Sequence, residues 1–477
     1  MGARYPPHPM AAPFTVLIMA AGQGTRMLSD TPKVLHRVAG KSLVEWAADA
    51  ARAAGAERVV AIVRPGDGVA EGLPHGVEVA EQREGEGTGA AVLAARDAVL
   101  GEGGSAGSVD PGAVVVLSAD HPLITPEQLE GILDEHARKD ARATLLTTDQ
   151  LDPAGYGRIV RDSSGNVDRI FETKYTDHLT PEELAVKEVN LGTYVFDAQT
   201  LFDALDNVGM EQGERYLTGV FPLIREEGGT IAAHMTDDAA AALGINDRLG
   251  LMAADESAQR RIIETHARAG VTFLQPGTTR VEAGVTIGRD STIAPGTVLE
   301  GTTVIGERCE IGPHTTARDA TIRDGATVVH SFVLEAEVGA GAKVGPFAYL
   351  RPGTLIGEGA KVGTFVEIKN SEIGSGAKVP HLSYIGDADV GEDSNLGAST
   401  ITANYDGRKK HRTKLGKSVK TGIHTSLVAP LDIGERAYTG AGSTINEDVP
   451  DGALGIARAK QKNIEGYADR VEEDSQK

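Results

Sequence analysis

The sequence predicts two different folds in one chain, an α/β domain followed by a β-helix of six-residue repeats. Up to about residue 248, short apolar runs alternate with alanine-rich stretches of helical spacing, which is typical of an α/β domain with a mostly parallel sheet. Beyond residue 271, apolar residues recur at every sixth position. The chain has 477 residues, too many for one hydrophobic core, so at least two domains are expected.

The α/β domain is expected over residues 14–248. Its strands are predicted from apolar runs and its helices from periodic stretches, at residues 14–18, 59–63 and 114–117 and at residues 42–54 and 88–100 respectively. Residues 1–13 lack the apolar stretch of a signal peptide and are expected to be a disordered extension. The segment 249–270 combines helical spacing with many charges, which predicts a connecting helical arm.

The β-helix is expected over residues 271–465, with a disordered acidic tail over 466–477. Three registers of the six-residue period are present: Ile287, Ile293, Leu299, Ile305, Ile311 and Ala317; Val338, Val344, Leu350, Ile356, Val362 and Ile368; Leu415, Thr421, Leu427, Ile433, Thr439 and Ile445. Three hexads complete one triangular coil, so residues 18 apart should stack about 4.8 Å apart. The period does not fix the hand of the coil.

Composition narrows the function. The formal net charge of −21 disfavours nucleic acid or an anionic membrane as a partner, so a phosphate ligand must meet locally concentrated Arg and Lys. The single cysteine, Cys309, cannot form an intrachain disulfide, which favours a reducing cytoplasm, and we interpret it as a buried packing residue. No apolar stretch is long enough to span a membrane.

A glycine turn follows the first predicted strand, in the segment Met19–Lys33, MAAGQGTRMLSDTPK. Its spacing fits neither the dinucleotide pattern nor the P-loop. It also carries Arg26 and Lys33, fixed positive charges that suit a triphosphate. Further along, Asp120 ends a predicted strand, where it is either a helix cap or a ligand for Mg²⁺.

The glycine turn resembles the L-A-A-G-x-G-T-R-M…P-K signature of sugar-nucleotide pyrophosphorylases, with Met19 in place of Leu. The resemblance implies an α/β nucleotidyltransferase with a Rossmann-like mixed sheet, in which Arg26 and Lys33 neutralise the departing pyrophosphate. It implies Mg²⁺ at Asp120 and Asn246. It also implies that UTP and the sugar are bound by Met19, Ala20, Ala21, Gly22, Lys33, Gln82, Gly87, Thr88, Ser118, Ala119, Asp120, Gly157, Glu172, Asn190 and Asn246. Glu86 stands where an apolar residue is common.

The coil carries polar residues that a purely structural repeat does not need. Arg351 and Lys369 are 18 residues apart and each follows an inward position, so they should converge on one anion; the alternative is two solvated surface cations. His381 lies nearby in VPHLSYIGDA and is a candidate general base. The basic loop 408–414, RKKHRTK, is either a solvated excursion or a clamp for the phosphates of CoA.

This region closely resembles the acetyltransferase domain of the bifunctional N-acetylglucosamine-1-phosphate uridylyltransferase/glucosamine-1-phosphate acetyltransferase family, through its H-L-x-Y-x-G-D-A and N-Y-D-G motifs. The resemblance implies a left-handed coil, a homotrimer, and His381 as the base that deprotonates the sugar amine. It implies that glucosamine 1-phosphate is bound by Arg351, Lys369, Tyr384 and Asn395, and acetyl-CoA by Ala398, Asn404, Tyr405, Ala441 and Arg458. Ile423 replaces a serine that contacts acetyl-CoA, so weaker binding is expected.

The predicted function is therefore synthesis of UDP-N-acetylglucosamine from small-molecule substrates. Acetyl-CoA would acetylate glucosamine 1-phosphate, and the product would attack UTP and release pyrophosphate. The rival prediction is a nucleotidyltransferase with one activity, whose coil is only structural or regulatory. The rival does not require a base or an anion pair on the coil, whereas the sequence carries both.

Overall fold

The computed structural model describes residues 13–101, 112–153, 156–171, 180, 185–211, 213–238, 240 and 243–475. The chain divides into two compact units, residues 1–258 and 259–477, and the boundary falls inside helix α8 (Arg248–Arg268). The extension predicted over residues 1–13 lies, apart from Pro13, outside the described residues. None of the helices in the described ranges combines the length and the apolar character that crossing a membrane requires.

The first unit is built on a mixed sheet. Its strands lie side by side in the order β11 (Ile231–Met235), β7 (Ala143–Thr148), β10 (Val189–Asp197), β6 (Ala113–Ser118), β1 (Phe14–Met19), β4 (Arg58–Val63) and β5 (Glu78–Glu81). A hairpin of β8 (Arg158–Arg161) and β9 (Val167–Phe171) joins at β10, and β2 (Arg37–Val38) pairs with β3 (Lys41–Ser42). Strand β10 runs antiparallel to β6 and β7, while β1 is parallel to β4 and β6. The predicted mixed sheet is therefore confirmed.

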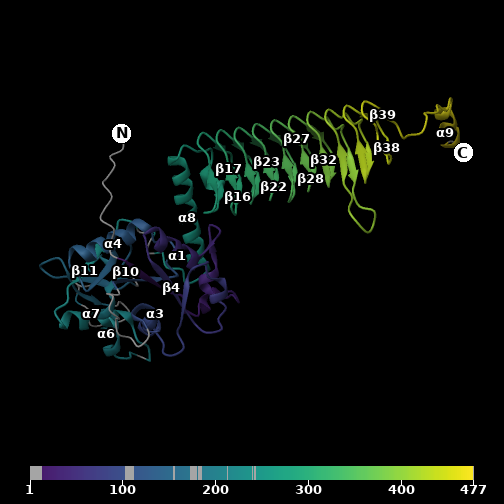
Figure 1. Ribbon diagram of the computed structural model, residues 1–477. Coiled ribbons are helices and arrows are strands. Elements are labelled where there is room, and N and C mark those ends of the chain that lie inside the picture. The colour runs from purple at the N-terminus through teal and green to yellow at the C-terminus, as the bar shows by residue number, and fades with distance from the viewer. Residues whose placement is uncertain are drawn as a thin grey trace. The chain divides into compact units, whose positions relative to one another are not determined.

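Helices cover both faces of this sheet (Figure 1). They are α1 (Leu43–Ala53) and α4 (Pro126–Arg138) on one face, and α2 (Thr88–Leu93), α3 (Arg96–Leu100), α6 (Ala198–Asn207) and α7 (Val220–Glu226) on the other, with 3₁₀ turns η1 (Thr25–Met27), η2 (Lys33–Leu35), η3 (Ala70–Gly72) and η5 (Leu217–Gly219). Because side chains alternate along β1, Leu17 enters one hydrophobic core and Val16 the other. Helix α1 begins at Ser42 because Ser42 and Glu45 cap each other's backbone N–H groups.

The second unit is a coil with three parallel sheets. The first contains β12 (Thr272–Phe273), β15 (Thr292–Ile293), β18 (Glu310–Ile311), β21 (Thr327–Val328), β24 (Lys343–Val344), β27 (Lys361–Thr364) and β30 (Lys378–His381). The second contains β13 (Arg280–Val281), β16 (Val298–Glu300), β19 (Thr316–Arg318), β22 (Phe332–Leu334), β25 (Tyr349–Leu350), β28 (Glu367–Lys369), β31 (Tyr384–Gly386), β33 (Ile401–Ala403), β35 (Ser426–Val428) and β38 (Thr444–Ile445). The third contains β14 (Thr286–Ile287), β17 (Val304–Ile305), β20 (Thr321–Ile322), β23 (Glu337–Val338), β26 (Leu355–Ile356), β29 (Glu372–Ile373), β32 (Ala388–Val390), β34 (Thr413–Leu415) and β36 (Leu431–Ile433). Near the C-terminal end of the coil, β37 (Tyr438–Thr439) and β39 (Leu454–Gly455) form a separate two-stranded sheet. Near its start, the 3₁₀ turn η7 (Pro276–Thr278) precedes β13.

Every residue of the three predicted inward registers is buried. Coils stack by parallel pairing of residues one turn apart, as between Leu350 and Ile368. The registers differ because some sides of the triangle contain five residues, so that Ile368 pairs onward with Ile385 after only 17 residues. Figure 1 shows this regular stack of strands, with one loop leaving it in the yellow-green part. The predicted coil of hexapeptide repeats is confirmed and is consistent with the left-handed form.

The two ends of this unit differ from each other. At its start, the side-chain amide of Gln259 on α8 exchanges two hydrogen bonds with the backbone of Val281, at 2.8 and 3.0 Å, and Ile263 packs into the hydrophobic core of the coil. At its end, the prediction of a disordered tail is wrong for the described part, because α9 (Tyr467–Ser475) forms there. Asp469 lies in the first turn of α9, where a negative charge favours helix formation.

Candidate functional site

The glycine turn, residues 19–24, begins where β1 ends in the middle of the sheet. Ala20 N–H bonds the carbonyl of Ile62 at 2.9 Å, which fixes the start of the turn. Gly24 has a φ of 60°, and a Cβ there would lie 2.6 Å from the Cβ of Lys33. Glycine is therefore required both by the backbone conformation and by the close approach of Lys33. The turn brings Lys33 to the end of the neighbouring strand β6.

Asp120 is the centre of a charged cluster at that strand end. Its carboxylate accepts hydrogen bonds from Lys33 Nζ at 2.6 Å and from Ser118 Oγ at 2.5 Å, and His121 Nδ1 lies 3.0 Å away. Burial would raise the pKa of this carboxyl, but His121 and Lys33 outweigh it and hold the pKa well below its usual range. Asp120 is therefore an anion at neutral pH, as a metal ligand must be.

Asn246 lies next to this cluster although it is 126 positions further along the chain. The backbone N–H of Ile245 donates to the Asp120 carbonyl at 2.8 Å, and Arg26 donates to Asn246 Oδ1 at 3.0 Å. Within the described part of the chain, no three His, Cys, Asp or Glu side chains form a metal cluster. One carboxylate and one amide oxygen suit a hard divalent cation whose other ligands are water and substrate phosphate.

A cleft of about 640 Å³ opens beside these residues, and we call it the nucleotide cleft. Nine of the residues predicted to bind UTP line it: Met19, Ala21, Gly22, Lys33, Gln82, Gly87, Thr88, Ser118 and Asp120. The remaining lining residues are Gln23, Val34, Arg64, Glu86, Ala91, Gly213, Glu214 and Tyr216. Residues 213–216 belong to no motif, so sequence reasoning had no signal that could find them.

The other predicted sugar-nucleotide residues lie outside the lining of the cleft. Ala20 and Ala119 are buried beneath it, and Arg26 and Asn246 pair with each other. Gly157 and Asn190 are joined by a backbone hydrogen bond of 2.8 Å from Asn190 N–H to the Gly157 carbonyl, so these two positions are brought together. The prediction for Glu172 falls outside the described residues.

Residues 82–88 form another wall of the cleft. We call this segment the base loop, because its residues Gln82, Gly87 and Thr88 are predicted to contact the nucleotide. Gln82 is buried and its amide donates to the Gly85 carbonyl at 3.1 Å. Gly87 has a φ of 96°, and a Cβ there would clash with the carbonyl oxygen of Arg215. Thr88 accepts a hydrogen bond at 2.9 Å from Leu217 N–H. The loop is thereby tied to the segment that begins at Gly213.

On the coil, Arg351 and Lys369 lie on adjacent turns, as the spacing predicts, because Arg351 N–H bonds the Ile368 carbonyl at 2.9 Å. Each has a carboxylate partner, Glu367 at 2.9 Å for Arg351 and Asp387 at 3.5 Å for Lys369. Lys410 of the basic loop lies beside Lys369, whose ammonium lowers the pKa of Lys410, first through a hydrogen bond and then through its positive charge. These three cations favour a negatively charged ligand. We call them the anion cluster, after the ligand that they would bind.

His381 heads a column of equivalent positions at one corner of the coil. On successive turns the carbonyls of His381, Ala398 and Ile423 accept hydrogen bonds from Ser399, His424 and Gly442 at 3.2, 2.8 and 2.8 Å, and Ala441 follows in the same place. We call His381, Ala398, Ile423 and Ala441 the His381 column. Within the described chain, the His381 ring has no hydrogen-bond partner, and its residue is exposed. The base candidate and three predicted acetyl-CoA contacts therefore share one corner.

The second sheet lies between this corner and the anion cluster. Tyr384 Oη lies 3.4 Å from the amide of Asn404, which also donates to Asp387 at 2.5 Å. Hydrogen bonds from Asn370 and Asn404, together with Lys369, outweigh the effect of burial and lower the pKa of Asp387. The remaining candidates, Asn395, Tyr405 and Arg458, are exposed, and no contact joins Arg458 to the others in the described structure.

Together these features define a class of protein, a nucleotidyltransferase joined to a transferase of the hexapeptide type. Residues 16–218 match the MobA-like NTP transferase domain, and residues 284–319 and 335–370 match the bacterial transferase hexapeptide repeats. The bifunctional protein GlmU of Mycolicibacterium gilvum (strain PYR-GCK) is 45% identical over 95% of this chain and 91% of its own. Those of Geobacillus sp. (strain WCH70) and Corynebacterium glutamicum (strain R) are 44% and 43% identical over 95% of this chain and 97% and 94% of theirs.

The chain belongs to the bifunctional GlmU family. The prediction of a bifunctional enzyme that produces UDP-N-acetylglucosamine, with nucleotidyltransferase and acetyltransferase domains, is thereby confirmed. The nucleotidyltransferase family indicates a nucleotide-sugar enzyme that uses a metal, and the repeats indicate oligomerisation.

Proposed function

We propose that acetyl transfer takes place on the second sheet of the coil, between the anion cluster and the His381 column. The observation that carries this proposal is that a group of cations and an exposed imidazole lie apart from each other on one surface of the coil. The three cations of the cluster suit the phosphate of glucosamine 1-phosphate, whereas the exposed imidazole of His381 has no partner that competes for a proton. A structural coil needs neither feature.

In this proposal, His381 accepts a proton from the amine of glucosamine 1-phosphate as the nitrogen attacks the thioester carbonyl of acetyl-CoA. The carbon–nitrogen bond forms, the carbon–sulfur bond breaks, and CoA leaves. Arg351, Lys369, Tyr384 and Asn395 hold the sugar phosphate. Acetyl-CoA lies along the column at Ala398, Ile423 and Ala441 and contacts Asn404, Tyr405 and Arg458.

The nucleotide cleft performs the second step. The phosphate of N-acetylglucosamine 1-phosphate attacks the α-phosphorus of UTP, and pyrophosphate leaves. Arg26 and Lys33 stabilise the negative charge of the leaving group, and the base loop binds uracil through Gln82, Gly87 and Thr88. Gly157, Glu172 and Asn190 bind the sugar. Asp120 and Asn246 would hold Mg²⁺, which supplies charge neutralisation for the phosphates.

The assembly and location are part of the same proposal. Parallel coils of this kind present open faces that can be shared between copies, and we expect a homotrimer. The single buried cysteine, Cys309, fits a reducing cytoplasm.

The experiment measures thiol release from acetyl-CoA with and without glucosamine 1-phosphate. In parallel, pyrophosphate release from UTP is measured with N-acetylglucosamine 1-phosphate, with Mg²⁺ and with chelator. The proposal expects both releases, each dependent on its sugar phosphate, and the second dependent on Mg²⁺. Pyrophosphate release without any sugar-dependent thiol release would instead favour the rival, a coil that is only structural or regulatory.

A further inference from the structure

An ion pair crosses the nucleotide cleft that the proposed reaction does not use. Arg64 follows the last residue of β4, and Glu86 lies in the base loop. The guanidinium donates to both carboxylate oxygens of Glu86, at 3.2 and 2.6 Å, which is a two-pronged geometry. The Nε of the same guanidinium donates to the Ala21 carbonyl in the glycine turn at 2.8 Å. One side chain therefore connects the two loops between which the nucleotide is expected to lie.

Both ends of this connection are anchored by the backbone. Arg64 N–H donates to Asp67 Oδ2 at 3.1 Å. The carbonyl of Glu86 accepts a hydrogen bond from Arg215 N–H at 2.8 Å, and Arg215 in turn accepts one from Gly89 N–H at 2.8 Å. The side chains therefore link two fixed frameworks, and the acidic residue in place of the usual apolar one at position 86 supplies the link.

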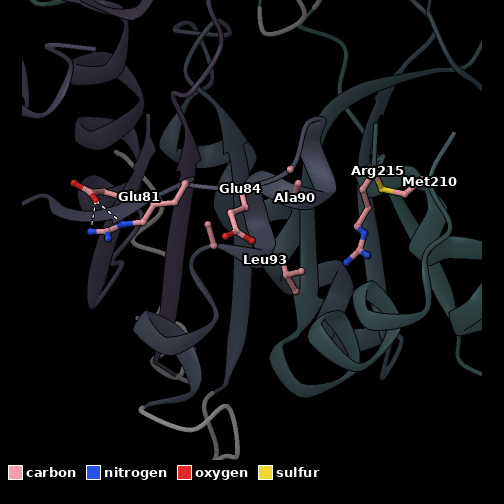
Figure 2. Close-up of a pocket in the computed structure, with 9 residues that line it drawn as sticks. Glu81, Glu84, Ala90, Leu93, Met210 and Arg215 are labelled. Atoms are coloured by element: carbon pink, nitrogen blue, oxygen red, sulfur yellow. Dashed lines mark hydrogen bonds and ion pairs between the residues drawn. The ribbon is translucent and has the colours of Figure 1, made fainter. Parts of the chain in front are cut away.

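The base loop has little side-chain packing to hold it in place, because it lies between two open clefts. The second cleft, of about 580 Å³, is lined by Glu81, Arg83, Glu84, Gly85, Ala90, Leu93, Ala94, Met210 and Arg215. Figure 2 shows Glu84 and Arg215 on opposite sides of this cleft, with Ala90 and Leu93 between them. Hydrogen bonds and ion pairs, rather than burial, must therefore set the position of the loop relative to the glycine turn.

We propose that the Arg64–Glu86 pair is a clasp that holds the glycine turn and the base loop at the separation that UTP requires. This inference rests on the proposed uridylyl transfer in the same cleft. The phosphates and the base of one nucleotide must contact the two loops at once, so fixing their separation in advance lowers the ordering cost of binding. Arg64 and Glu86 act as positioning residues on UTP binding, not on bond formation.

The clasp predicts a separation of KM from kcat in uridylyl transfer. Arg64→Gln removes the pair and the bond to Ala21, and should raise the KM for UTP about threefold to tenfold. Glu86→Gln removes only the pair, which is partly exposed, and should raise it about twofold to fivefold. In both variants kcat should stay within about twofold of the unmodified enzyme.

Two further variants distinguish a clasp from general damage. The double variant Arg64→Gln/Glu86→Gln should have a KM for UTP no higher than that of Arg64→Gln alone, because the first substitution already removes the ion pair. Arg64→Lys keeps the charge but loses the two-pronged geometry, and should recover part of the affinity. The matched control is Arg58→Gln at the other end of β4. Arg58 also makes a two-pronged pair, with Glu78 at 2.9 and 2.6 Å, and also donates to a backbone carbonyl, but it lies outside the cleft.

UTP binding by titration calorimetry, without sugar phosphate, gives the same comparison in the absence of turnover. Circular dichroism and thermal unfolding of the same preparations show whether the first unit of each variant is folded, and Glu86→Gln and Arg64→Lys preserve the test if Arg64→Gln does not fold. An unchanged UTP affinity in Arg64→Gln and Glu86→Gln, a tighter affinity in Glu86→Gln, or an equal loss in Arg58→Gln would overturn the clasp. Unmodified enzyme that binds UTP without uridylyl transfer would instead refute the proposed function and leave the clasp open to the binding comparison.

Discussion

Replacing Ile423 by serine should strengthen acetyl-CoA binding. Ile423 occupies the third position of the His381 column, where the family resemblance places a serine that contacts acetyl-CoA. Its residue is 52% exposed, and its carbonyl is already bonded to Gly442 N–H at 2.8 Å. The substitution therefore changes the surface that meets the ligand, while the backbone bond that stacks the coil remains.

Two opposing effects decide the size of the change. A hydroxyl that hydrogen-bonds the ligand typically contributes about 0.5–1.5 kcal/mol. The exposed half of an isoleucine could instead bury apolar area against the CoA arm, worth about 1 kcal/mol. The hydroxyl should win, because a β-branched side chain has few rotamers with which to avoid the thioester, and crowding reduces its contact. We expect the KM for acetyl-CoA to fall about threefold to tenfold.

The assay is thiol release at saturating glucosamine 1-phosphate, with uridylyl transfer as the control that should not change. Ile423→Ala and Ile423→Thr separate the causes, because alanine removes the crowding without adding a hydroxyl and threonine adds the hydroxyl but keeps the branch. Equal gains in the serine and alanine variants would identify crowding as the main effect. An unchanged or higher KM in Ile423→Ser would refute the hydrogen-bond argument and show that the apolar contact dominates.

Four other variants test the remaining parts of the structure. Asp120→Ala should abolish metal-dependent uridylyl transfer and leave acetyl transfer near its original rate, and equal loss of both in a folded protein would contradict separate sites. His381→Ala should lower acetyl transfer by about 10²-fold or more and spare uridylyl transfer, whereas normal acetylation would remove His381 from the mechanism. Lys410→Ala should raise the KM for glucosamine 1-phosphate about threefold to tenfold, as expected for one charged contact. An unchanged KM would remove Lys410 from the sugar-phosphate site and leave the loop as a solvated excursion or a clamp for the phosphates of CoA. Gly363→Ala should destabilise the coil by about 1–3 kcal/mol, measured by thermal unfolding, because its Cβ would meet the Pro380 carbonyl, and an unchanged Tm would contradict this packing.

The sequence predicted the coil more fully than the α/β domain, and the reason is periodicity. A residue such as Leu350 is inward because every sixth residue must be inward, so burial and stacking follow from counting alone. The pairing of Arg351 with the turn of Lys369 follows from the same count. The five-residue sides were not predictable by counting, because a residue at positive φ occurs both in a shortened side, as at Asn370, and in a full six-residue side, as at Asp290.

The nucleotide cleft could be predicted only where a motif marks it. The glycine turn and Asp120 carry local signals, a required positive φ and a strand end, and both lie in the cleft. Tyr216 lines the cleft although it is far in sequence from the glycine turn and from Asp120, and no local pattern in the sequence marks such a contact. Glu86 is a visible departure from the family pattern, but the sequence does not indicate its partner Arg64, since an ion pair between positions 22 residues apart has no sequence signature.

A strictly periodic coil can present side chains only from equivalent positions of its repeats. The basic loop adds a side chain, Lys410, that does not come from such a position. The loop leaves the coil after β33 and returns at β34, while the pairing on both sides is kept, Thr402 with Leu427 and Leu415 with Ile433. Lys410 can therefore approach Lys369 without shifting any residue of the His381 column. By contrast, an inserted residue between His381 and Ala398 would move Ala398, Ile423 and Ala441 by one position and separate His381 from the rest of the column. Lengthening the loop should be tolerated, and a single insertion in that turn of the coil should abolish acetyl transfer.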